Sequence, residues 1–155
     1  MASPISTVRD ELALFATLME LMKQEQQLLV AADTDALGTI TPQKAQLVAQ
    51  MAALSKQRHA HLAAAGHAPE DASMQLWLGQ VREPASEELW QDLLAATRQA
   101  KEINRVNGML IAKQLTNNQT IINAMRTPTG AADTAVYGPS GQTSSTATSR
   151  RVVIG

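Results

Sequence analysis

The stretch that decides the fold is residues 86–127, SEELWQDLLAATRQAKEINRVNGMLIAKQLTNNQTIINAMRT. It contains no proline and a single glycine, Gly108. Glu87 and Glu88 follow its first residue, and their charge suits the positive end of a helix dipole. The stretch therefore predicts one long helix that continues until Pro128. At 1.5 Å per residue, about 40 residues span roughly 60 Å.

A first helix is predicted upstream, from about Thr7 to Ala32. Thr7 can cap it, with Asp10 reaching back three residues later. Its apolar side chains form two adjacent rows that cover about 200° of the helix surface, which is more than one partner helix can bury. We therefore expect this helix to meet two neighbours, or one neighbour and a client.

A second helix is predicted after a break at residues 33–42. Thr41 is the expected cap, Pro42 suits the first helical position, and Gly66 ends the helix. The seam of this helix is Leu47, Met51, Leu54, Arg58 and Leu62. We expect Arg58 to lie along its apolar neighbours with its head in water. At about 25 residues, each of the first two helices spans only some 35–40 Å, so the long helix must be flanked by a connector or project past its partners.

Residues 67–85 form that connector, with a short helix predicted around Asp71 to Leu78 and Trp77 packing it onto the bundle. From Thr127 the sequence is dominated by Gly, Pro, Ser, Thr and Ala, which favours a flexible tail. The fold class expected is all-α: an antiparallel, coiled-coil-like three-helix bundle with a long C-terminal helix, a short connector helix and a flexible tail. The expected parts are a helical bundle, 1–126, and a low-complexity tail, 127–155.

Polar side chains interrupt the apolar face of the long helix. They are Thr97, Asn104, Asn107, Gln114 and Asn118. Buried polar groups cost free energy unless they are hydrogen-bonded, so two interpretations compete. In one, the amides fix the register of a bundle, as buried Asn does in coiled coils. In the other, this part of the face receives a partner. We favour the first for Asn104 and Asn107, and the second from Gln114 onward.

Composition argues against several classes of function. The chain has a formal charge of −1 and a pI of about 6.3, and no basic cluster predicts nucleic-acid binding. It has no cysteine, no apolar run long enough to cross a membrane and no visible secretory signal, so we expect a cytoplasmic protein without membrane insertion. His59, His61 and His67 lack metal-ligand spacing and are expected to be solvated. No metal site, cofactor or catalytic arrangement is predicted, and we expect no enzyme.

The tail contains VYGPSGQTSS, residues 136–145, with Tyr137 as the only tyrosine of the chain. An exposed aromatic on a flexible segment is typical of a docking residue, because it supplies a large contact area at a low cost in rotamer entropy. Pro139 restricts the neighbouring backbone and lowers the cost of ordering it. The alternative is that Tyr137 folds back onto its own bundle.

Three stretches resemble the FlgN family of flagellar type III export chaperones. They are TPQKAQLVAQMAALSKQRHAHLAAAG in the second helix, INRVNGMLIAKQL in the third, and VYGPSGQTSS in the tail. The resemblance covers nearly the whole chain. The end of the second helix, which is rich in Ala and contains His, is less typical of the family.

The resemblance implies a cytoplasmic chaperone that binds hook–filament junction proteins of the FlgK and FlgL type through their C-terminal regions. It implies that the chaperone keeps these clients unassembled and export-competent and delivers them to the cytoplasmic domain of the export gate protein. By position, the client-binding residues are Ile111, Leu115, Asn118, Ile121, Ile122 and Met125. Those that bind the gate are Tyr137, Gly138 and Pro139. The alternative from another class is a non-catalytic structural bundle that self-assembles through the wide face of its first helix without a client.

Overall fold

A computed structural model describes residues 2–126, and within that range the chain has four α-helices and no strand. The helices are α1 (Val8–Ala31), α2 (Thr34–Ala64), α3 (Ala72–Val81) and α4 (Pro84–Arg126). The all-α class is confirmed for these residues. The expected tail lies outside the described range, so the division into a bundle, 1–126, and a tail, 127–155, stays a prediction.

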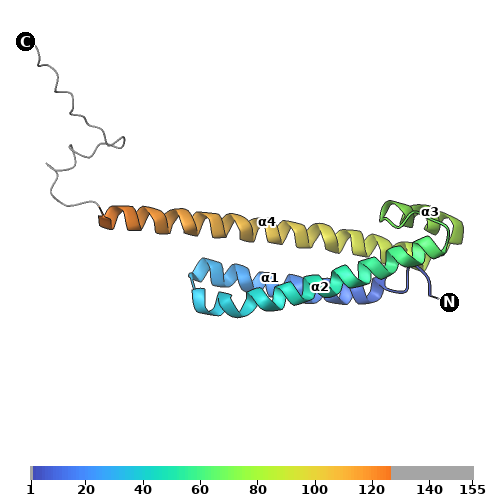
Figure 1. Ribbon diagram of the computed structural model, residues 1–155, viewed down its shortest axis with the longest axis horizontal. Helices are drawn as coiled ribbons and strands as arrows, with labels where there is room; N and C mark the ends of the chain where they lie inside the picture. The colour runs from blue at the N-terminus through green and yellow to red at the C-terminus, as the bar shows by residue number, and fades with distance from the viewer. Residues whose placement is uncertain (1, 127–155) are drawn as a thin grey trace, which may run out of the picture. The chain divides into compact units, whose positions relative to one another are not determined.

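The chain divides into one unit, Met1–Ala112, and a second unit that begins at Lys113. Within the first unit, α1 and α2 pack side by side as an antiparallel hairpin, and the first part of α4 runs in the same direction as α1 (Figure 1). The contacts agree with this direction, because Val8 and Trp90 share one cluster whereas an amide further along α4 bonds to the carbonyl of Met22.

Helix α4 has 43 residues, against 24 in α1 and 31 in α2, so the prediction of one dominant helix is confirmed. It begins at Pro84, two residues before the predicted start. Proline at the first helical position costs nothing, since the N–H it lacks would have had no partner within the helix. The hydroxyl of Ser86 donates a hydrogen bond to the Glu83 carboxylate just outside the helix.

The predicted start of α2 was wrong. The break between α1 and α2 is very short. Helix α1 ends at Ala31, the next residue, Ala32, is left-handed with φ 56°, and Asp33 caps α2 by accepting a 3.1 Å bond from the N–H of Ala36. Pro42 therefore lies inside the helix rather than at its first position. An aspartate cap at residue 33 was a stronger start signal than the Thr-Pro pair.

The helix continues through Pro42, and the residue one turn earlier is a glycine. Proline removes one backbone donor and crowds the carbonyl one turn earlier. Here that earlier residue is Gly38, which has open space where a Cβ would stand. Three side chains of this turn, Thr39, Thr41 and Gln43, donate hydrogen bonds to backbone carbonyls three or four residues earlier, over 2.7–3.3 Å. Carbonyls near the proline are thus satisfied from the side chains.

The other helix ends follow the sequence more closely. Gly66 has a φ of 87°, a left-handed conformation that glycine adopts without strain, and it follows the end of α2 as predicted. Thr7 precedes α1, but it makes no capping bond and its hydroxyl donates to Glu11 instead, at 2.8 Å. The capping box expected with Asp10 is therefore wrong.

Two apolar clusters form the core of the first unit. One joins all four helices and centres on Trp77 and Trp90, with the buried residues Val8, Leu62, Met74, Leu78 and Leu93. The other joins α1, α2 and α4, with Leu18, Met22 and Ala100 buried and Phe15, Leu47 and Met51 packed against them. Trp77 fastens α3 to the bundle as expected, while Leu76 on the same helix is exposed.

Candidate interaction surfaces

The last part of α4 presents large apolar side chains to solvent. The last buried residue of this helix is Asn107, and every residue from Lys113 to Arg126 is exposed except the partly buried Gln114. The apolar side chains of that segment are Leu115, Ile121, Ile122 and Met125, with exposed fractions from 43% to 81%. Ile111, in the last turn of the first unit, is 44% exposed. The predicted client-binding residues are thus solvent-exposed, and nothing in the structure tests what they bind.

These side chains share one side of the helix. At 100° per residue, Leu115, Asn118, Ile121, Ile122 and Met125 fall within an arc of about 120°. We call these five residues the α4 stripe. Their spacing of three, four and seven is that of a helix face which packs against another helix. Asn118 is exposed and places one amide within this apolar surface.

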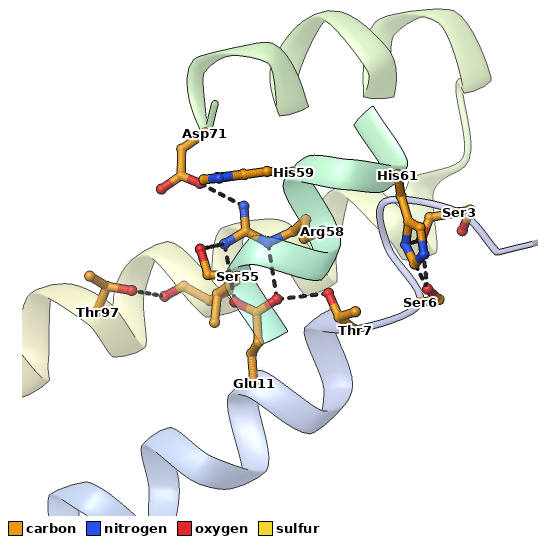
Figure 2. Close-up of polar contacts among 11 residues, drawn as sticks. Ser3, Ser6, Thr7, Glu11, Ser55, Arg58, His59, His61, Asp71 and Thr97 are labelled. Carbon is orange, nitrogen blue, oxygen red and sulfur yellow. Dashed lines mark hydrogen bonds and ion pairs between the residues drawn. The ribbon is translucent and has the colours of Figure 1, made fainter. Parts of the chain in front are cut away.

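A buried ion-pair cluster fixes the other end of the bundle (Figure 2). Arg58 of α2 donates to both carboxylate oxygens of Glu11 on α1, at 3.0 and 3.1 Å, and to Asp71 at 2.6 Å. Its guanidinium also lies over the Trp90 ring, 5.0 Å from the centroid. The Arg58 side chain therefore ties α1, α2, α4 and the connector together. The expectation that its head lies in water was wrong.

The cluster changes the ionisation of its members. Burial alone lowers the pKa of Arg58, but the hydrogen bonds that it donates to Glu11 and Asp71, together with their negative charges, outweigh it and raise that pKa above its ordinary value. Burial alone raises the pKa of Asp71, but the hydrogen bonds from His59 and Arg58 outweigh it and lower that pKa. Both groups are thus held in their charged forms.

A second polar cluster joins α1, α2 and α4 further along. Asn107 is buried, and its amide donates to the carbonyl of Met22 at 2.8 Å and to Glu25 at 2.7 Å. Lys44 of α2 donates to Glu25 at 3.2 Å and to the side-chain oxygen of Asn104 at 2.7 Å. Both neighbours of the Asn107 amide are acceptors, so its orientation is determined. These are the contacts expected if Asn104 and Asn107 fix register.

The histidines are more involved than predicted. His59 is partly buried and bonds to Asp71 at 2.7 Å, with its Nε2 as donor because the carboxylate accepts. His61 contacts the carbonyl of Ser3 at 3.0 Å, and His67 contacts the side chain of Gln80 at 3.1 Å. They tie neighbouring segments together, so describing them as solvated was wrong. Within residues 2–126, no group of acidic or histidine side chains is arranged to hold a metal ion.

Sequence reasoning missed the two glutamates that anchor these clusters. The row of α1 that faces the core is Val8, Glu11, Phe15, Leu18, Met22, Glu25 and Leu29, at alternating spacings of three and four. A search for apolar residues alone assigns Leu12 and Met19 to the core-facing row in place of Glu11 and Leu18. Both glutamates fit the alternating spacing of three and four along this row, and the other helices carry basic and amide residues that can pair with them. These two features together could have revealed the glutamates from the sequence.

The remaining predicted site, Tyr137 with Gly138 and Pro139, lies outside the described residues. Among the residues that are described, none of the helices is both long and apolar enough to cross a bilayer. The surface that stands out is therefore the α4 stripe, a helical surface suited to another protein chain.

An exposed apolar stripe of this kind is typical of surfaces that bind other proteins. The chain belongs to the FlgN protein family, whose family model matches residues 1–145 and so includes the VYGPSGQTSS segment. FlgN proteins are a family of flagellar export chaperones, a non-catalytic class whose members bind hook-associated proteins of the flagellum. No curated protein and no solved structure matches the chain.

Proposed function

We propose that the chain is a cytoplasmic flagellar export chaperone whose clients are hook–filament junction proteins of the FlgK and FlgL type. It binds their C-terminal regions, keeps them unassembled and export-competent, and delivers them to the cytoplasmic domain of the export gate protein. The observation that carries this proposal is the α4 stripe: four large apolar side chains that remain exposed on one side of a helix in a chain of this family.

The stripe suits a helical client segment. Removing apolar surface from water contributes roughly 25 cal/mol per Å² to stability, so a client helix that covers the stripe gains free energy of binding. Recognition of this kind uses spaced apolar anchors along one face of the bound helix. Asn118, within the stripe, adds an amide that a matching polar side chain of the client can satisfy, which favours one register of binding.

Charge favours a foreign client over a second copy of the chain. Residues 103–126 contain no Asp or Glu, whereas they contain Arg105, Lys113 and Arg126. Two copies of this segment placed face to face would bring like charges together, which opposes association. A client helix with acidic residues beside its apolar face is the better complement.

Delivery is assigned to the tail. Tyr137, with Gly138 and Pro139, is proposed to contact the gate, since a lone tyrosine in a Gly- and Pro-containing segment offers an aromatic anchor for a pocket on another protein. The stripe and Tyr137 are separate in sequence. A client and the gate can therefore be bound by different parts of the chain.

The test is a calorimetric titration of the chain with C-terminal fragments of FlgK- and FlgL-type proteins and, separately, with the soluble gate domain. Saturable binding of the fragments with a defined stoichiometry supports the proposal. A C-terminal fragment of an unrelated filament protein is the control. Equal binding of that control, or no binding of either fragment, contradicts it.

One observation favours the structural alternative. A hollow of about 470 Å³ lies between α1 and α2, lined by Ala13, Leu14, Ala53 and Leu54 with polar residues at its edge. Leu14 belongs, with Leu18, Leu21 and Leu28, to the second apolar row of α1, which makes this the surface through which such a bundle would self-assemble. Gel filtration with light scattering separates the two readings, because self-association that persists with an added client fragment favours the structural one.

A further inference from the structure

A second groove lies within the first unit, between α2 and α4. Two hollows of about 450 and 260 Å³ share Phe15, Val48, Thr97 and Lys101 in their linings, so they form one continuous groove. Phe15 of α1 lies in its floor, and α2 and α4 supply the walls. Val48 is 50% exposed here although it faces other apolar side chains, and Met51 and Leu94 in the same lining are only partly buried. The groove is an apolar surface that the three helices leave uncovered.

The charges in this groove leave one cation unpaired. Arg58, Glu11 and Asp71 bond to one another at one end, and Lys44 bonds to Glu25 and Asn104 at the other. Lys101, in the middle, is exposed, and its ammonium group makes no hydrogen bond or ion pair with any residue that the structure describes. The α2 wall adds no opposing charge, because residues 36–64 contain no Asp or Glu. A ligand that fills the groove therefore meets apolar side chains and a free ammonium group.

Two segments of this chain, residues 103–126 and residues 127–155, offer little acidic complement to that groove. Residues 127–155 contain one acidic residue, Asp133, and two arginines, Arg150 and Arg151. Residues 103–126, which carry the exposed apolar helix of any second copy, contain no acidic residue. Neither the chain's own tail nor that helix of a second copy matches an apolar groove with an unpaired lysine.

We propose that the groove between α2 and α4 is a docking site for an amphipathic helix of a different protein, with acidic residues beside its apolar face. The apolar side chains of that helix cover Phe15, Val48 and Leu94, and a carboxylate pairs with Lys101. The partner helix completes the apolar packing that α1, α2 and α4 leave open. This site is distinct from the α4 stripe and does not rest on the proposed function.

The probe is a labelled synthetic peptide of about 18 residues with leucines at helical spacing and glutamates beside them, and a matched peptide with lysines in place of the glutamates. Binding to the full chain is followed by fluorescence anisotropy. Lys101→Glu and Val48→Asp alter the groove, while Val30→Asp, at a residue that is 73% exposed on α1 and outside the groove lining, is the control. Because the α4 stripe also suits an acidic helix, each variant is compared again in a Leu115→Asp background, which separates binding at the stripe from binding at the groove. Circular dichroism checks that each variant is folded.

We expect the acidic peptide to bind the wild type and to lose about tenfold or more in affinity with Lys101→Glu or Val48→Asp, because a like charge or a buried carboxylate then opposes it. Val30→Asp should leave its affinity unchanged, and the losses caused by Lys101→Glu and Val48→Asp should persist in the Leu115→Asp background. The lysine peptide should bind Lys101→Glu more tightly than it binds the wild type. This reversal depends on Lys101 and not on stability.

Other outcomes overturn the proposal. No binding of the acidic peptide to the wild type contradicts it, and loss with Leu115→Asp alone assigns the peptide to the α4 stripe. If Val48→Asp converts a dimer into a monomer in light scattering, the occupant is a second copy. If removal of residues 127–155 is needed before the peptide binds, the occupant is the chain's own tail.

Discussion

Arg58 on α2 and Glu11 on α1 form a two-pronged ion pair in which each side chain is only 4% exposed. Two charges at this depth stabilise the fold only as a pair, because either one alone has lost its hydration without compensation. We expect Arg58→Ala or Glu11→Ala to lower the free energy of unfolding by about 3–5 kcal/mol. Urea unfolding followed by circular dichroism measures this. Arg105→Ala, in the exposed pair with Glu102, is the control and should leave the midpoint nearly unchanged. A small effect at Arg58 would show that water reaches the pair.

Asp71 makes the stability of the bundle depend on acid. Its pKa is lower in the folded protein than in the unfolded chain, so its ionised form stabilises the fold above the ordinary pKa of an aspartate. That contribution is lost as the pH falls through the folded pKa. We expect the urea midpoint of the wild type to fall more steeply below about pH 4 than that of Asp71→Asn. Parallel curves for the two proteins would rule out this role of Asp71.

Asn107 is predicted to be essential to the packing of α4. Replacing it by leucine removes the two hydrogen bonds that its amide donates, to the carbonyl of Met22 and to the Glu25 carboxylate, and leaves that carboxylate with Lys44 as its remaining partner. We expect Asn107→Leu to lower the free energy of unfolding by about 1–3 kcal/mol, because a hydrogen bond to a neutral carbonyl and one to a charged carboxylate are both lost. Asn104→Leu, at an exposed residue, should cost less. If Asn107→Leu were as stable as the wild type, the amide would fix the register of the helices without adding to their stability.

Ile122 tests the client surface. Because it is 43% exposed in the free protein, Ile122→Asp should leave helical content and melting temperature nearly unchanged. Affinity for a FlgK- or FlgL-type fragment should fall by about tenfold or more, since an aspartate replaces an apolar anchor. Thr120→Asp is the matched control, as it places the same charge about 200° around the same helix. Unfolding of Ile122→Asp, or an equal loss with Thr120→Asp, argues against the stripe.

Tyr137 tests the proposed separation of gate and client. We expect Tyr137→Ala to shift stability by no more than about 0.5 kcal/mol and to leave client binding intact. Binding to the soluble gate domain should fall by about ten- to a hundredfold, the usual effect of losing a central aromatic anchor. Calorimetric titration against both partners decides this. Equal losses would place Tyr137 in the client site, and no loss would mean that it has no docking role.

Residue periodicity predicted where the helices lie, but it did not predict the polar contacts between them. The number of long helices, the dominance of α4 and the packing of Trp77 all follow from apolar spacing and from the positions of Gly and Pro, which are local properties. The start of α2 did not, because the side-chain bonds around Pro42 become visible only once the backbone is placed. Glu11 and Glu25 were missed for a related reason. A buried glutamate in α1 is stable only if a cation on another helix pairs with it, here Arg58 for Glu11 and Lys44 for Glu25. The sequence of one helix alone does not reveal such a pair.

For the candidate surfaces, the exposure of Leu115 and Ile122 could be anticipated from the length of α4. The groove between α2 and α4 could not, because it depends on how far apart two helices stand over Phe15, and spacing along the sequence does not encode that separation. Tyr137 was found by its rarity, a signal that needs no fold at all.

Both tryptophans of the chain, Trp77 and Trp90, lie in the single cluster where the four helices meet, with the Arg58 guanidinium over one of them. Tryptophan fluorescence is therefore a reporter of that cluster alone, while circular dichroism weighs every helical residue equally. The emission of Trp90 responds to the ion pair beside it and is blind to the last turns of α4. A change in helical circular dichroism without a change in tryptophan emission therefore indicates an event away from the cluster, such as one at the exposed end of α4.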